Sequence, residues 1–140
     1  MSLLSRKGLL AVTAVLDVAL HADHQPVASK ALADRQRLPP RHLEPVLQAL
    51  VRRGVLKGIR GPRGGYQLAR ASSQITADDI LRAIRTIDDE EEGAVVKSTL
   101  LTRVVLPVLA QAEVAFSTAL AHISVEDLVG AAKVMRRSAA

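Results

Sequence analysis

The hydrophobic pattern of this sequence changes its period at Gly54, and that change limits the folds that the chain can adopt. Before Gly54, apolar residues repeat at the spacing of one buried helix face: Leu43, Val46, Leu47, Leu50 and Val51. After it, residues 55–59 and 66–69 are short strand-compatible runs, separated by the turn-rich segment Arg60-Gly61-Pro62-Arg63-Gly64-Gly65. The sequence therefore predicts a helix with a left-handed cap at Gly54, followed directly by a hairpin with a basic tip.

Three helices are predicted before the hairpin. The first spans residues 5–22, and its core-facing residues are expected to be Leu9, Val12, Leu16, Ala19 and Leu20. The second spans 29–35 with Leu32 inward, and the third begins at Pro40, which suits the first helical position because its missing N–H would be unpaired there. Leu38 can pack on Leu43 as a hydrophobic staple. Two short helices joined by a short turn predict a helix-turn-helix, and the hairpin predicts its wing.

The amino-acid composition points to a mainly α fold. The chain has 140 residues, 49% of them hydrophobic, but only one Tyr, one Phe and no Trp, so the core must consist of Leu, Val, Ile and Ala. Cysteine is absent, which excludes disulfides, thiolate metal sites and thiol catalysis. His21 and His24 have a helical ligand spacing, but we interpret them as a solvated helix end, so we expect no metal and no cofactor.

The second half of the chain predicts an association helix. Thr76 and Ser124 are expected N-caps, each followed three residues later by an acidic residue. Between them we expect an acidic loop over 88–97 and a long helix over 98–122, kinked at Pro107. The predicted organisation is a DNA-binding domain over 1–87, the loop, and a dimerisation helix plus C-terminal helix over 98–140. Apolar residues cover more than one face of the long helix, so a second copy is the simplest cover, with this predicted interface: Leu101, Val104, Val108, Ala112 and Phe116.

The start of the chain also has a secretory interpretation. Arg6-Lys7 followed by an apolar stretch resembles a signal sequence, although Asp17 interrupts that stretch. No apolar run approaches the roughly 20 residues that span a bilayer. We therefore expect a cytoplasmic protein without a membrane partner.

Charge is unevenly distributed along the chain. Residues 1–87 carry 14 Lys or Arg against 6 Asp or Glu, a net charge of +8, whereas residues 88–140 have a net charge of −3. A basic winged helix-turn-helix indicates double-stranded DNA as the partner. The predicted contacts lie at the start of the first helix, on the recognition helix and on the wing: Arg6, Lys7, Arg41, His42, Gln48, Arg52, Arg60, Arg63, Gly64 and Gly65.

Other functions have weaker support. A winged helix can serve as a protein-binding module without touching DNA. An enzyme is disfavoured because the sequence shows no nucleophile–base pairing or metal-ligand cluster, and the Gly-rich segment lacks the ending of a nucleotide-binding loop. The acidic run 88–92 is most simply a solvated loop, and hard-cation binding is the lesser alternative.

The segments 43–47, 55–69 and 75–80 resemble the Rrf-two (Rrf2) family of winged-helix regulators, and the most specific part is the wing sequence Arg60-Gly61-Pro62-Arg63-Gly64-Gly65-Tyr66. The closing Ile-Ser-Val-Glu-Asp-Leu at 123–128 extends the resemblance over nearly the whole chain. It implies a homodimer with crossing long helices that binds a pseudo-palindromic operator, usually as a repressor. It also implies that Arg60 enters the minor groove.

Three departures from the family pattern stand out. Many members carry three cluster-ligating cysteines before the long helix, where this chain has the acidic segment 88–97. Regulation by a small molecule, by a protein partner or by neither stays open. Pro45 occupies a position where relatives often have a base-reading residue, so the base preference does not carry over. Leu10 occupies a position that is commonly aromatic in relatives.

Overall fold

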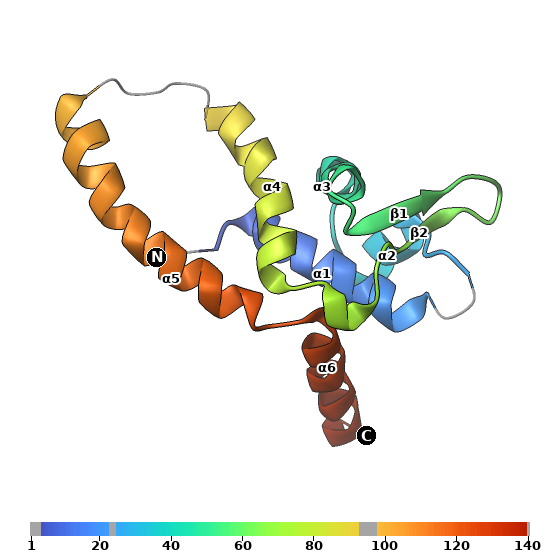
Figure 1. Cartoon of the computed structure of the whole chain (residues 1–140). Coiled ribbons are helices and arrows are strands. Elements are labelled where there is room, and N and C mark those ends of the chain that lie inside the picture. The colour runs from blue at the N-terminus through green and yellow to red at the C-terminus, as the bar shows by residue number, and fades with distance from the viewer. Residues whose placement is uncertain (1–3, 23–24, 93–97, 140) are drawn as a thin grey trace.

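The computed structural model describes residues 4–22, 25–92 and 98–139 and consists mainly of helices with one two-stranded hairpin (Figure 1). In chain order the elements are α1 (Arg6–His21), α2 (Ser29–Gln36), α3 (Pro40–Arg52), β1 (Leu56–Ile59), β2 (Gly65–Leu68), η1 (Ser72–Gln74), α4 (Ala77–Glu92), η2 (Leu101–Val105), α5 (Leu106–Ala121) and α6 (Val125–Ala139). The predicted fold class, a mainly α winged helix-turn-helix with a long C-terminal helix, is confirmed.

The helix-turn-helix forms as the local sequence predicts. Helix α2 ends at Gln36 and is capped by Arg37 in a left-handed conformation, and α3 starts three residues after Arg37 with Pro40 at its first position. At the far end of α3, Gly54 is left-handed with φ 74°, and the Val55 N–H donates to the Leu50 carbonyl at 3.0 Å. These two chain reversals set α3 between α2 and the wing.

The wing is an antiparallel hairpin in which Leu56 pairs with Leu68 and Ile59 with Gly65. Its root is tied to the segment before α2: the Val27 N–H donates to the Tyr66 carbonyl at 2.9 Å, and the Tyr66 N–H donates to the Val27 carbonyl at 2.8 Å. The base of the hairpin is therefore attached to the helical body by these backbone hydrogen bonds as well as by its chain connections.

Helix α1 lies at the centre of the core and contacts α2, α3, α4, α6 and β2. The predicted core face of this helix was right only in part: Val12 and Ala19 pack against the core, whereas Leu9 is 47% exposed and Leu16 and Leu20 are only partly buried. The buried residues are mostly smaller: Gly8, Ala11, Ala14, Val15, Asp17 and Val18. Small side chains let neighbouring helices approach α1 closely, and the Cβ of an alanine at position 8 would lie 2.7 Å from Leu81 Cδ2.

Helix α3 also differs from its predicted pattern at one position. Leu43, Val46, Leu47 and Leu50 are buried as expected, together with Ala49, but Val51 is 36% exposed. Val51 lies at the edge of the stripe and lines a hollow beside the wing. In α2, Leu32 is fully buried as predicted.

A buried ion pair joins α1 to α2. The Asp17 carboxylate is fully buried and accepts hydrogen bonds from Arg35 Nε and Nη2, at 3.0 and 2.9 Å, and from Gln36 Nε2 at 2.7 Å. Burial alone would raise the pKa of Asp17, but the bonds from Arg35 and Gln36, with the charges of Arg35 and His21, outweigh it, and the pKa is lowered. Asp17 therefore stays ionised at neutral pH.

The acidic run differs from its prediction. Residues 88–92 belong to the last turns of α4, which ends at Glu92, so the expected loop over 88–97 does not begin at 88. Residues 93–97 lie outside the described residues. The start of α4 is as predicted, since Thr76 and Asp79 form a capping box with bonds of 3.0 and 3.1 Å. Ser124 and Asp127 repeat that box before α6.

The long helix accommodates Pro107 through a π-helical turn. Over η2 the bonding shifts by one residue, and the Leu106 N–H donates to the Leu101 carbonyl. The stretch Leu101–Ala121 is 21 residues long with a mean hydropathy of 1.7 and is mostly exposed. By length and composition it could cross a membrane, so the expectation that no apolar segment approaches that size was wrong.

The Asp17 cluster predicts a pH-dependent loss of stability. Arg35→Ala should lower the free energy of unfolding at pH 7 by about 2 kcal/mol, less than for a fully buried pair because Arg35 is 37% exposed. A carboxyl whose pKa is lowered by folding contributes stability above its unfolded pKa and loses it as pH falls through the folded value. The difference between wild type and Arg35→Ala in urea denaturation should therefore shrink at acidic pH. An equal difference at pH 7 and pH 3 would contradict this assignment.

Candidate nucleic-acid interface

The exposed face of α3 carries the predicted recognition residues. Arg41 and His42 are exposed in its first turn, and Gln48 and Arg52 are exposed further along. Gln48 and Arg52 line a shallow hollow of about 370 Å³ with Gly58 and Tyr66 of the hairpin. The structure therefore places this end of α3 directly beside the wing.

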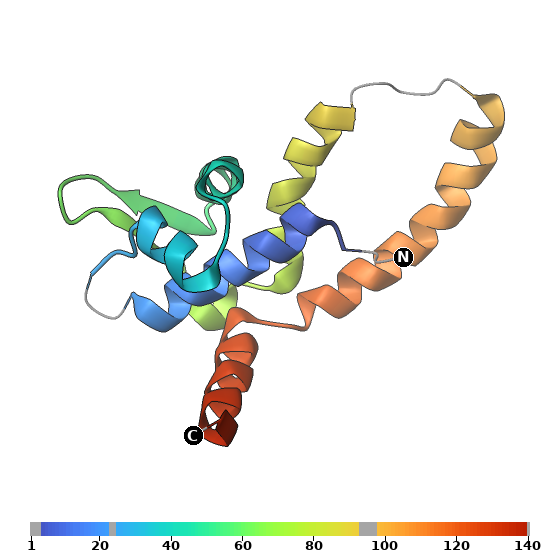
Figure 2. The ribbon, with the colours of Figure 1, turned by 180° about the vertical axis from the view of Figure 1, so that it is seen from behind.

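The wing tip carries two arginines on the exposed turn of the hairpin. Arg60 directly follows β1, Arg63 lies in the turn before β2, and both side chains are exposed. The hairpin projects away from the helical body in both views of the chain (Figures 1 and 2). Two cationic side chains thus stand on a narrow projection, a shape and charge that suit a DNA minor groove.

Gly64 and Gly65 have a structural role that sequence reasoning missed. A Cβ on Gly64 would overlap the Ile59 carbonyl oxygen across the hairpin, and a Cβ on Gly65 would overlap the Val27 carbonyl. These glycines let the hairpin close and let its root pair with the segment before α2. The Gly64-Gly65 pair is visible in the sequence, where it was predicted only as a DNA contact.

Tyr66 and Glu44 were not predicted as contacts from the sequence, because neither is basic. Burial, and secondarily the negative charge of Glu44, raise the pKa of the Tyr66 hydroxyl. The phenol is therefore neutral at physiological pH and can donate a hydrogen bond at the junction of recognition helix and wing.

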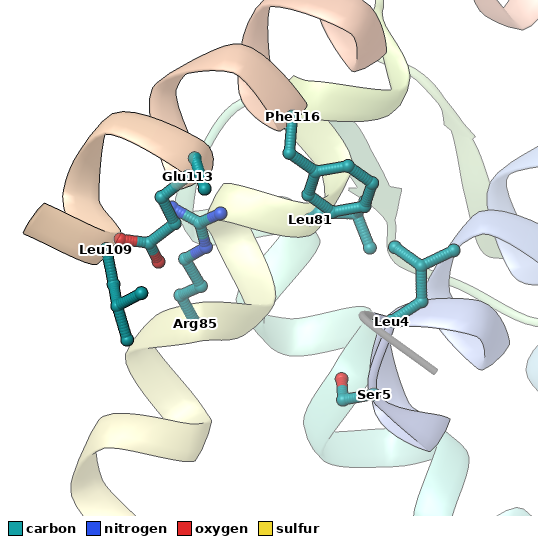
Figure 3. Close-up of a pocket in the computed structure, with 8 residues that line it drawn as sticks. Leu4, Ser5, Leu81, Arg85, Leu109, Glu113 and Phe116 are labelled. Carbon is teal, nitrogen blue, oxygen red and sulfur yellow. The ribbon is translucent and has the colours of Figure 1, made fainter. Parts of the chain in front are cut away.

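The structure does not place Arg6 and Lys7 with the wing. They follow Ser5, which lines a cavity of about 430 Å³ with Leu81 of α4 and Phe116 of α5 (Figure 3). Arg6 is exposed and Lys7 is half-buried. The start of α1 therefore lies on the α4–α5 side of the domain.

The predicted association residues of the long helix divide into two groups. Val104, Val108 and Ala112 are exposed, Val108 to 59%. Leu101 and Phe116 are half-buried, and Phe116 packs against a small cluster of Ala77, Leu81 and Leu120 within the chain. Further apolar side chains of the long helix stand exposed: Leu100, Val105, Leu106, Leu109 and Val114.

Comparison with known proteins decides the family. The model of the Rrf2 family, described as iron-dependent transcriptional regulators, matches residues 4–131. The chain belongs to the Rrf2 family. A helix-turn-helix transcriptional regulator of Synechocystis is 46% identical over 81 residues, which are 58% of this chain and 55% of that protein. The chain thus matches about half the length of that relative.

Longer matches cover nearly the whole chain. The regulator IscR of Xenorhabdus nematophila is 34% identical over 131 residues, 90% of this chain and 78% of that protein. Among solved structures, T. potens IscR has a TM-score of 0.71 at 31% identity, covering 92% of this chain and 87% of that one. CymR, the global cysteine regulator of B. subtilis, has a TM-score of 0.69 at 27% identity, covering 93% and 98%. These similarities extend the family's fold through the long helix.

The residues of this Rrf2 member do not fit a thiolate-ligated iron–sulfur cluster. The sequence contains no cysteine, and iron–sulfur clusters are held mainly by cysteine thiolates. Within residues 4–22, 25–85 and 98–138, no three His, Asp or Glu side chains gather as metal ligands. This chain therefore lacks the cysteine ligands that would hold an iron–sulfur cluster, although the family is described as iron-dependent.

The packing of Gly65 predicts a localised effect on the wing. Gly65→Ala should cost about 2 kcal/mol or more of stability, because its Cβ would displace the Val27 carbonyl from the Tyr66 N–H. Gly58→Ala is the matched control, since its Cβ would meet nothing within 4 Å. Thermal denaturation should separate the variants, and hydrogen exchange of the Tyr66 amide should be faster only in Gly65→Ala. Equal stability of the two variants would refute the structural role.

Proposed function

We propose that this protein is a homodimeric transcriptional repressor of the bacterial cytoplasm that binds a pseudo-palindromic DNA operator without an iron–sulfur cluster. The observation that carries the proposal is the joint exposure of Arg41 and His42 on α3 and of Arg60 and Arg63 on the adjoining wing. Two cationic elements of different shape on one rigid body suit the two grooves of one duplex.

Each element has a distinct task in this proposal. The first turn of α3 presents side chains to base edges of the major groove, and Arg41 and His42 can also reach phosphates. The wing inserts Arg60 or Arg63 into the minor groove, where negative potential is strongest in narrow A·T-rich segments. Gln48 and Arg52 lie between these elements and suit contacts to the intervening backbone.

The exposed long helix supports the dimer. Soluble monomers rarely leave a large contiguous apolar surface exposed. The first part of this helix has several exposed large apolar side chains, Val108 among them. A second copy packed there would bury them and present two recognition helices with two-fold symmetry, the symmetry of a pseudo-palindrome. A repressor then acts by occupying the operator.

Substitution of the two key arginines tests the DNA-binding surface. Arg60→Ala and Arg41→Ala should each weaken binding to a duplex selected by the wild-type protein by about tenfold or more, equivalent to about 1.4 kcal/mol or more. Fluorescence anisotropy at several salt concentrations measures the affinity, and a lost phosphate contact should also lower the salt dependence.

Arg136→Ala is the control for this measurement. Arg136 is an exposed arginine of α6, and this helix projects from the body away from α3 and the wing (Figure 2). Its removal lowers the net charge equally, so a loss of affinity equal to that of Arg60→Ala would mean general charge attraction and would refute the assigned surface.

Substitution in the long helix tests the dimer. Val108→Glu should shift the protein to monomers at micromolar concentration, because a carboxylate would be buried at the predicted interface without a partner. Val134→Glu on α6 is matched in exposure, 61% against 59%, and should stay dimeric. Sedimentation velocity measures both variants, and a folded monomeric wild type would exclude the proposed assembly.

A further inference from the structure

A closed ring of hydrogen bonds joins α4 to α5. Asp78, in the first turn of α4, is 7% exposed, and each of its carboxylate oxygens has a different partner. Ser117 Oγ of α5 donates to Asp78 Oδ1 at 2.6 Å, and Arg82 Nε donates to Asp78 Oδ2 at 2.7 Å. Arg82 Nη2 also donates to Ser117 Oγ at 3.1 Å. We call these three residues the α4–α5 clamp.

The clamp lies where the long helix meets the DNA-binding body. It adjoins the small apolar cluster of Ala77, Leu81 and Leu120, on which Phe116 packs. Helices α4 and α5 approach one another at this end and diverge toward their other ends in both views (Figures 1 and 2). The exposed part of the long helix, from Thr102 to Ala112, is therefore held mainly through this junction.

A small change in the angle between α4 and α5 at this junction would cause a large displacement at the far end of the long helix. The 21 residues from Leu101 to Ala121 span about 30 Å at 1.5 Å per residue, so a tilt of about 10° displaces the far end by about 5 Å. That displacement exceeds the rise of one DNA base pair, about 3.4 Å. A change of about 10° in the angle between α4 and α5 could therefore move one part of the dimer relative to DNA by more than one base pair.

We propose that the α4–α5 clamp fixes the tilt of the long helix and thereby sets the operator half-site spacing that the dimer prefers. Asp78, Arg82 and Ser117 are positioning residues: they adjust the distance between the two recognition surfaces without touching DNA. The buried Asp78 carboxylate favours one angle between α4 and α5, because tilting α5 would remove the Ser117 hydroxyl from a carboxylate oxygen that is shielded from water. This inference rests on the proposed homodimer and its operator.

The first test measures geometry without DNA. Because the chain has no cysteine, Asp34→Cys creates one spin-label position, exposed on α2, and the dimer then reports one distance between its two bodies. In this background Ser117→Ala should shift or broaden the distance distribution by about 3 Å or more, given the length of the lever. Thr118→Val is the matched control, since the Thr118 hydroxyl donates to the Val114 carbonyl of its own helix.

The second test measures spacing preference. Duplexes selected by the wild-type protein from a random pool are remade with the spacer one base pair shorter or longer, and as single half-sites. Ser117→Ala should reduce the wild-type discrimination between spacers by about 2- to 10-fold, the range expected for one net hydrogen bond, while half-site affinity stays unchanged. Thr118→Val should keep the wild-type spacer profile.

The outcomes separate this inference from the function on which it rests. An unchanged distance distribution and spacer profile in Ser117→Ala would overturn the clamp, while wild-type operator binding would leave the proposed function standing. Equal weakening on half-sites and all spacers would also overturn it, because the variant would then disturb recognition itself. If Asp34→Cys without a further substitution yields no inter-protomer distance, and the wild type binds neither the spaced duplexes nor the half-sites, then the homodimer, the operator and this inference are refuted together.

Discussion

The arrangement of the DNA-binding body depends on one buried carboxylate. Asp17 lies on the central helix α1 without exposure to water, and Arg35 and Gln36 at the end of α2 satisfy both of its oxygens. A buried charge without such partners would cost several kcal/mol, so α2 is held at one position against α1. Because α3 follows α2 after only three residues, the same contact also places the recognition helix.

The wing is fixed by a different kind of contact. Its root is held by backbone hydrogen bonds to Val27, and glycines at the crowded positions let those backbones come together. The arginines at the tip have no role in this packing and remain exposed. The residues that hold the hairpin are therefore different from the arginines proposed to bind DNA, so the tip can be basic without weakening the fold.

The long helix, unlike α2 and the wing, has few contacts within the chain, and most of its apolar surface stays exposed. It is attached to the body at one end, through Phe116, Leu120 and the Asp78–Arg82–Ser117 ring. A regulator of this family without cysteine has no thiolate cluster to order the region before this helix. The α4–α5 clamp offers a different means of fixing the helix, through hydrogen bonds between three polar side chains.

The sequence by itself determined the order of elements, the turns and the capping boxes, because helical period, Gly54 and the Thr76–Asp79 pair act over a few residues. It also determined that the long helix would be left with exposed apolar faces. Only the tertiary structure decided which face of the apolar helix α1 is buried, that Asp17 meets Arg35 across 18 positions, and that Ser117 meets Asp78 across 39. Those choices depend on how closely helices can pack and on which polar groups then lose water, and neither quantity is encoded in local spacing.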